Sequence, residues 1–148
     1  MNRITLNNKI QMPMLGFGTF LMGGSECEES VHAAIRSGYR MIDTAEAYGN
    51  EETVGSAIVK SGIPREELFL VTKVNFRSYE NTRETVEASL NKLKTSYLDL
   101  VLLHWTFGNY YAAWRELEKM YHEGKIRAIG VSNFDPGRLI DLIEFNEV

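Results

Sequence analysis

The spacing of apolar and polar residues changes repeatedly along the chain, and these changes predict an alternation of strands and helices. Residues 3–13, RITLNNKIQMP, alternate around an Asn7-Asn8 pair that tolerates positive φ, so we predict a short hairpin ending at Pro13. Five strand-helix units follow it. The predicted strands are 14–20, 39–45, 68–74, 97–105 and 125–133, and the predicted helices are 25–38, 50–62, 81–96, 110–124 and 135–148.

The helix boundaries rest on residues that commonly begin or end helices. Ser25 is the expected N-cap of the first helix, which closes at Gly38, and Pro136 stands at the start of the last helix. The third helix offers one apolar stripe to a sheet, formed by Val86, Leu90, Leu93 and Tyr97.

Near-continuous apolar strands such as LFLV and VLLH, each followed by a helix, indicate an α/β protein with a parallel sheet covered by helices. Two architectures fit: an open doubly wound sheet, or part of a closed (β/α) barrel. The stretch LGFGTFLMGG lacks the G-x-G-x-x-G spacing of a dinucleotide fingerprint. Asp43 only weakly indicates the acidic residue that would bind a ribose at the end of the second strand. The pattern therefore favours the barrel.

Polar residues directly follow the apolar residues of four predicted strands: Asp43, Lys73, His104 and the pair Ser132-Asn133. Taken singly, Asp43 could cap a helix, Lys73 could be a solvated strand end, and His104 an interior histidine. Ser132-Asn133 alone reads as a turn with a helix cap. In a parallel barrel, however, all these positions lie on the C-terminal face, where catalytic groups are found. Together they favour one site.

The chemistry of this set suits the reduction of a carbonyl group. A tyrosine hydroxyl such as that of Tyr48, with a reference pKa near ~10, donates its proton poorly at neutral pH unless a cation stabilises its anion. Lys73 could supply the cation, and the carboxylate of Asp43 could keep that lysine charged. His104 could orient a carbonyl oxygen toward the tyrosine.

Composition narrows the class of protein. The chain has 148 residues, the size of one domain over residues 1–148, and a net charge of −4 without a long basic run, so we expect no nucleic-acid partner. No apolar segment is long enough to span a membrane, and Cys27, taken as half-buried, is the single cysteine. We therefore expect a cytoplasmic protein that binds no membrane and has no metal site.

Five stretches resemble the aldo-keto reductase family: MPMLGFGTF, GYRMIDTAEAYGNEETVGSAI, LFLVTKV, YLDLVLLHW and WRELEKMYHEGKIRAIGVSNF. The second and the last are long and specific. The resemblance runs from the hairpin to the last residue. It implies a (β/α)₈ barrel closed at its bottom by an N-terminal hairpin, and NADPH-dependent reduction of aldehydes and ketones or the reverse oxidation.

The resemblance also implies roles for individual residues. Tyr48 would be the general acid, Lys73 and Asp43 the pair that lowers its pKa, and His104 the group that orients the substrate. The implied cofactor contacts are Asp43, Ser132 and Asn133, with Gly18, Thr19 and Phe20 on the rim, and the implied substrate-pocket walls are Phe20 and Trp105. The sequence departs from the family in HWTFGNYY, where a proline usually follows the histidine, and we expect a more flexible loop there.

Length is the larger departure, because a complete barrel takes about 250 residues. We expect an incomplete barrel of about five strand-helix units, without the later segments that grip the nicotinamide ring, pyrophosphate and 2′-phosphate in the family. Its open strand edges would invite self-association or a partner chain. Two hypotheses follow: an NADPH-dependent carbonyl reductase, or a catalytically silent half-barrel acting as an assembly module or as a fragment of a longer reductase.

Overall fold

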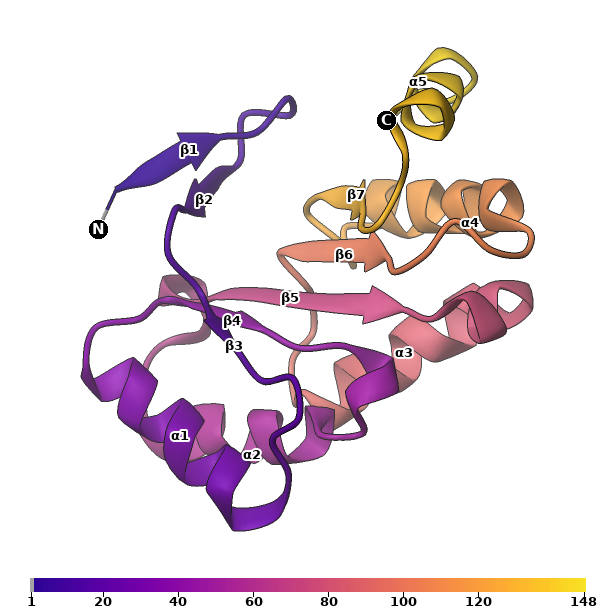
Figure 1. Ribbon diagram of the computed structural model, residues 1–148. Helices are drawn as coiled ribbons and strands as arrows, with labels where there is room; N and C mark the ends of the chain where they lie inside the picture. Colours follow the sequence, from indigo (N-terminus) through magenta and orange to yellow (C-terminus); the bar gives the residue numbers. More distant parts are fainter. Residues whose placement is uncertain (1) are drawn as a thin grey trace.

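The computed structural model describes residues 2–148 and contains a two-stranded hairpin followed by a five-stranded parallel sheet (Figure 1). The strands of the sheet neighbour one another in chain order, which is the order of a (β/α) barrel wall and not of a doubly wound sheet. The predicted parallel α/β alternation is thus confirmed. The sheet consists of β3 (Phe17–Gly18), β4 (Met41–Asp43), β5 (Phe69–Val74), β6 (Leu100–Leu103) and β7 (Ile129–Val131).

A helix follows each strand of the sheet, and the helices from α1 to α4 pack against one another in chain order. Figure 1 shows the first three of them together below the sheet. The helices are α1 (Gly24–Arg36), α2 (Glu51–Ser61), α3 (Thr82–Lys92), α4 (Tyr110–His122) and α5 (Pro136–Glu144). Three short 3₁₀ turns lie in the connections: η1 (Glu46–Tyr48), η2 (Arg65–Glu67) and η3 (Phe76–Asn81).

The hairpin of β1 (Arg3–Thr5) and β2 (Gln11–Pro13) lies at the end of the sheet where the strands begin. The side-chain amide of Asn8 donates a hydrogen bond to the carbonyl of Arg127, 2.8 Å away, just before β7. The reason given for the turn was wrong in detail, because positive φ occurs at Lys9 (70°) and at neither asparagine. The asparagines instead bind backbone amides within the turn through their side-chain oxygens.

Three other details of the sequence prediction are wrong. The N-cap of α1 is Gly23, with no side-chain cap bond, so Ser25 lies inside the first turn and not before it. Cys27 is fully buried in the core and not half-buried. The helix predicted over 81–96 ends at Lys92, which leaves Tyr97 outside it, stacked beneath the guanidinium of Arg65.

Two buried contacts hold the outer helices and the lower end of the sheet. Gly55 of α2 meets the end of α3 so closely that an added Cβ would lie 2.3 Å from the carbonyl oxygen of Lys92. Asp99, only 1% exposed, accepts hydrogen bonds from Arg65 (2.7 Å), Arg127 (3.0 Å) and the amide of Leu70 (2.9 Å). Any larger residue at position 55 would clash with the end of α3. An uncharged residue at position 99 would leave the arginines without their buried carboxylate.

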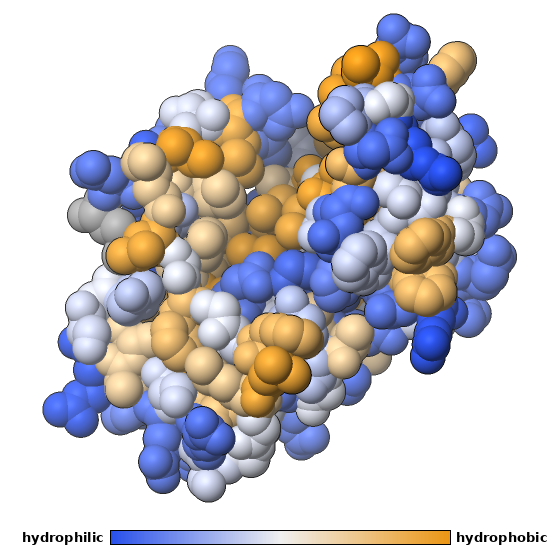
Figure 2. Space-filling view, in the orientation of Figure 1, coloured by the Kyte–Doolittle hydropathy of each residue, from blue (hydrophilic) through white to orange (hydrophobic). Residues whose placement is uncertain are grey.

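Apolar surface remains uncovered on the other side of the sheet. Figure 2 shows a hollow between the hairpin and α5, with hydrophobic side chains within it. A pocket of about 230 Å³ there is lined partly by Trp114, Ile129 and Val131. Ile140 and Ile143 of α5, and Phe145 just after it, are exposed. The described residues therefore leave one face of the sheet and one face of α5 open.

Candidate active site

The residues predicted to form one site all lie at the carboxyl end of the parallel sheet. Asp43 is the last residue of β4, Lys73 lies one residue before the end of β5, and His104 directly follows β6. Tyr48 ends the η1 turn that follows β4. Because parallel strands end at the same edge, residues 61 positions apart in the chain meet here, as Asp43 and His104 do.

The ammonium group of Lys73 is the centre of the site. It is 7% exposed and donates to the carboxylate of Asp43 at 2.6 Å, the carbonyl of Thr44 at 2.9 Å and the hydroxyl of Tyr48 at 3.4 Å. A lysine ammonium has three N–H donors, and each has one of these acceptors. The carboxylate thus balances the buried positive charge, and that charge is held against the tyrosine oxygen.

His104 lies beside the tyrosine, with ring centroids 5.9 Å apart and an edge-to-face arrangement. Burial, and next the positive charge of Lys73, lower the pKa of His104 below its ordinary value of 6.5. The imidazole is therefore neutral at pH 7 and carries a single N–H. Its Nδ1 is buried and has no hydrogen-bond partner among residues 2–148.

Two aromatic residues flank this pair. The ring of Phe20 lies 4.9 Å from that of Tyr48, and the indole of Trp105 stacks on His104 at 5.7 Å. Both side chains are partly exposed, so their apolar faces are open to a ligand. Phe107 continues the row by stacking on Trp105 at 6.1 Å. These rings form an apolar rim around a polar centre, which is the usual composition of a small-molecule site.

The residues expected to contact a cofactor occupy two separate loops. Gly18 is exposed, whereas Thr19 is fully buried and its hydroxyl donates to the carbonyl of Asp43 at 3.2 Å. After β7, the amide of Asn133 donates to the carbonyl of His104 at 2.8 Å and to the hydroxyl of Ser132 at 2.9 Å. Asn133 is exposed, and no described group donates to its side-chain oxygen. A hydroxyl and a free amide oxygen fit a carboxamide group.

Asn50 is a site residue that the sequence placed only at the start of a predicted helix. It is 2% exposed and accepts from the Thr44 hydroxyl at 2.7 Å. Its amide donates to the carbonyls of Thr19 at 2.8 Å and Met22 at 2.9 Å. Asn50 thus fastens the loop carrying Phe20 to the loop carrying Tyr48.

Two glutamates of the same segment were also missed. The carboxylate of Glu46 accepts from the amide of Asn75 at 3.0 Å and the hydroxyl of Ser78 at 2.6 Å, which ties η1 to the loop after β5. Glu51, buried at the start of α2, accepts from Thr72 at 2.6 Å, next to Lys73 in β5. No feature of the sequence distinguished these two glutamates from solvated ones.

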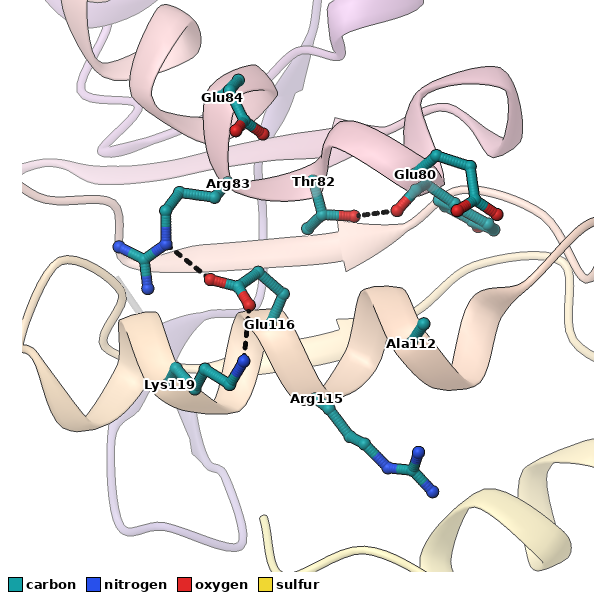
Figure 3. Close-up of a pocket in the computed structure, with 9 residues that line it drawn as sticks. Glu80, Thr82, Arg83, Glu84, Ala112, Arg115, Glu116 and Lys119 are labelled. Carbon is teal, nitrogen blue, oxygen red and sulfur yellow. Dashed lines mark hydrogen bonds and ion pairs between the residues drawn. The ribbon is translucent and has the colours of Figure 1, made fainter.

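The pocket in Figure 3, about 520 Å³ in volume, lies between α3 and α4 and not at the rim. Three of its charged side chains pair with one another, since Arg83 binds Glu116 and Glu116 binds Lys119 at 2.9 Å, while Arg115 points away from them. We assign no chemistry to it.

The described residues contain neither a candidate metal site nor a membrane-spanning helix. No group of three or more His, Cys, Asp or Glu residues within residues 2–148 could hold a metal ion. In the same part of the chain, every helix is too short or too polar to cross a membrane.

Comparison with known proteins gives consistent matches. The family model described as aldo/keto reductase family matches residues 14–146. Glyoxal reductase of Bacillus subtilis (strain 168) is 49% identical over 149 residues, covering 98% of this chain and 54% of that protein. The chain thus spans about half the length of the curated relatives it matches.

Solved structures agree with the family match. The crystal structure of an aldo/keto reductase from Brucella melitensis has a TM-score of 0.96 and 41% identity, covering 99% of this chain and 59% of that one. A Bombyx mori aldo-keto reductase in complex with NADP has a TM-score of 0.92 and 30% identity, covering 99% and 55%. The five-stranded sheet is therefore an incomplete barrel of this type.

Proposed function

Because the chain belongs to the aldo/keto reductase family, we propose that it takes part in the NADPH-dependent reduction of small aldehydes or ketones to alcohols. The observation that carries this proposal is the contact of one buried ammonium with both a carboxylate and a tyrosine hydroxyl, through Lys73, Asp43 and Tyr48. The name of the Bacillus relative, a glyoxal reductase, supports small carbonyl compounds as the substrate class.

In this proposal the protein supplies the proton and NADPH, when bound, supplies the hydride. Tyr48 gives its hydroxyl proton to the carbonyl oxygen, and the Lys73 ammonium stabilises the negative charge left on the phenol oxygen. Asp43 holds that ammonium in place. The neutral His104 donates its single N–H to the same carbonyl oxygen and so orients the substrate.

The cofactor proposal rests on two parts of the rim. Ser132 and Asn133 would hold the nicotinamide carboxamide, since they present a hydroxyl and a free amide oxygen beside the carbonyl of His104. Phe20 and Trp105 would bound the space for the substrate. The NADP complex of the Bombyx relative supports the choice of cofactor.

The test is NADPH consumption by the purified chain with a reactive small aldehyde. Tyr48→Phe should abolish it, whereas Tyr39→Phe, a conservative change away from the site, should leave it intact. Full activity in Tyr48→Phe would refute the mechanism. Absence of consumption in the unchanged chain would refute turnover by these 148 residues.

A second candidate is that the chain acts as a catalytically silent assembly module. The edge strands β3 and β7, each paired on one side only, and the exposed apolar residues Ile140, Ile143 and Phe145 favour association with a second copy of the chain. Light scattering should then show a dimer or larger assembly that Ile143→Lys weakens. A clean, stable monomer would contradict association, and tight NADPH binding would contradict the silent role.

A further inference from the structure

The loop after β6 carries three consecutive backbone carbonyls, and a side chain from elsewhere in the fold binds each one. Asn133, after β7, donates to the carbonyl of His104 at 2.8 Å. Tyr79, in η3, donates to that of Trp105 at 2.5 Å. Arg138, in α5, donates to that of Thr106 at 2.9 Å. The loop predicted to be more flexible for want of a proline is therefore anchored residue by residue.

Tyr79 makes the most constraining of these contacts. Its hydroxyl donates to the carbonyl of Trp105 and also accepts from the amide of the same residue at 3.2 Å. One phenol oxygen thus satisfies both backbone groups of one residue, which fixes the position and the tilt of that peptide segment. The ring is 3% exposed, and the hydroxyl of Thr82 binds the Tyr79 carbonyl at 2.9 Å. The anchor is itself held rigidly.

Burial raises the pKa of Tyr79 to about 12. The phenol therefore keeps its proton throughout the neutral range and remains a donor to the carbonyl of Trp105. The Tyr79 ring also lies next to the loop, since an added Cβ on Gly108 would lie 3.8 Å from it.

We propose that Tyr79 is a positioning residue of the active rim, which sets the orientation of the Trp105 indole against His104 through the two backbone bonds. The indole stacks on His104 at 5.7 Å with an interplanar angle of 26°. Loss of the phenol hydroxyl frees the Trp105 backbone, so that the stack loosens. Its effect on substrate binding rests on the proposed function, whereas its effect on the indole does not.

The two effects can be measured separately. The chain contains two tryptophans, Trp105 at the rim and Trp114 buried in α4, so ¹⁹F NMR of the full chain labelled with 5-fluorotryptophan gives two resonances. Trp105→Phe assigns them. Tyr79→Phe, which keeps the ring and removes only the hydroxyl, should shift or broaden the Trp105 resonance and leave that of Trp114 in place.

The matched control is Tyr39→Phe, because the Tyr39 ring packs edge-on against Phe17 and its hydroxyl makes no hydrogen bond within residues 2–148. This variant should move neither resonance. An unchanged Trp105 resonance in Tyr79→Phe would overturn the proposal, and so would an equal disturbance of both resonances, which indicates general loosening of the fold.

Steady-state kinetics form the second arm. Tyr79→Phe should raise KM for the aldehyde by about fivefold, the factor that one lost hydrogen bond produces, with a smaller change in kcat. A fall in kcat at unchanged KM would contradict a role in positioning the substrate wall. If the unchanged chain consumes no NADPH, the proposed function fails, and the NMR arm alone decides whether Tyr79 positions Trp105.

Discussion

Replacement of Asn50 by alanine tests whether the loops of the rim are joined through one buried amide. The change removes three hydrogen bonds, to the Thr44 hydroxyl and the carbonyls of Thr19 and Met22. At about 1 kcal/mol of net stabilisation for each bond, the free energy of unfolding should fall by about 3 kcal/mol. The side chain is 2% exposed, so water cannot easily enter to replace the lost partners. Asn50 is also the N-cap of α2 but makes no side-chain cap bond, so the figure contains no capping contribution.

Urea denaturation followed by far-ultraviolet circular dichroism measures this loss. Asn81→Ala is the matched control, because Asn81 is likewise an N-cap without a side-chain cap bond, at the start of α3, but is exposed. That variant should stay within about 0.5 kcal/mol of the unchanged chain. Equal stability of the two variants would refute the reasoning, since burial of the three bonds is the only feature invoked. Asn50→Asp should also destabilise, because a carboxylate oxygen would face the two carbonyls that now accept from the amide.

Three further predictions concern packing and charge. Gly55→Ala should destabilise the chain by at least about 2 kcal/mol in urea denaturation, since its Cβ would meet backbone, whereas Gly18→Ala, with open space at the end of β3, should cost little. Asp99→Asn should cost about 3 kcal/mol, because a buried charge with two arginine partners is lost, whereas the same change at the exposed Asp141 should cost little. The lowered pKa of His104 means that, as pH falls through 6.5, the unfolded chain binds a proton that the folded chain resists. Stability should therefore decline just below that pH, and His104→Gln should reduce the decline; an equal slope in both proteins would contradict it.

The arrangement of elements was predictable because it depends on local pattern. Apolar runs of strand length between helical stretches specify parallel units, and a parallel sheet fixes which end of every strand lies at the rim. Asp43, Lys73 and His104 could therefore be grouped before any contact was known. Strand lengths were less predictable: 14–20 was expected as a strand, but only Phe17–Gly18 pairs with β4. Pairing depends on the neighbouring strand, which a local pattern does not contain.

The anchors of the rim were not predictable for a related reason. Asn50 binds the backbone of Met22, 28 positions away, and Tyr79 binds that of Trp105, 26 positions away. A backbone carbonyl has no signature in the sequence. Asn50 stood at the start of a predicted helix, and no pattern singled out Tyr79. Ser25 shows the opposite error, since its residue type is suited to capping but it is the second residue of a helix that begins at Gly24. Residue type gives a capacity to bind, and only the fold supplies the partner.

The anchors join the loops that carry the residues proposed to donate the proton and orient the substrate. Glu46 ties the turn carrying Tyr48 to the loop after β5, and Tyr79 ties that loop to the backbone of Trp105. Asn133 then ties the carbonyl of His104 to the end of β7. Each bond joins the loops of neighbouring strands, so the four loops form one continuous chain of contacts along the sheet edge. Because every one of these partners lies within residues 2–148, the geometry of Tyr48, Lys73 and His104 depends on contacts that this chain supplies itself. Asn133, the residue proposed to bind the carboxamide, is thus hydrogen-bonded to the backbone of His104, the residue proposed to orient the carbonyl.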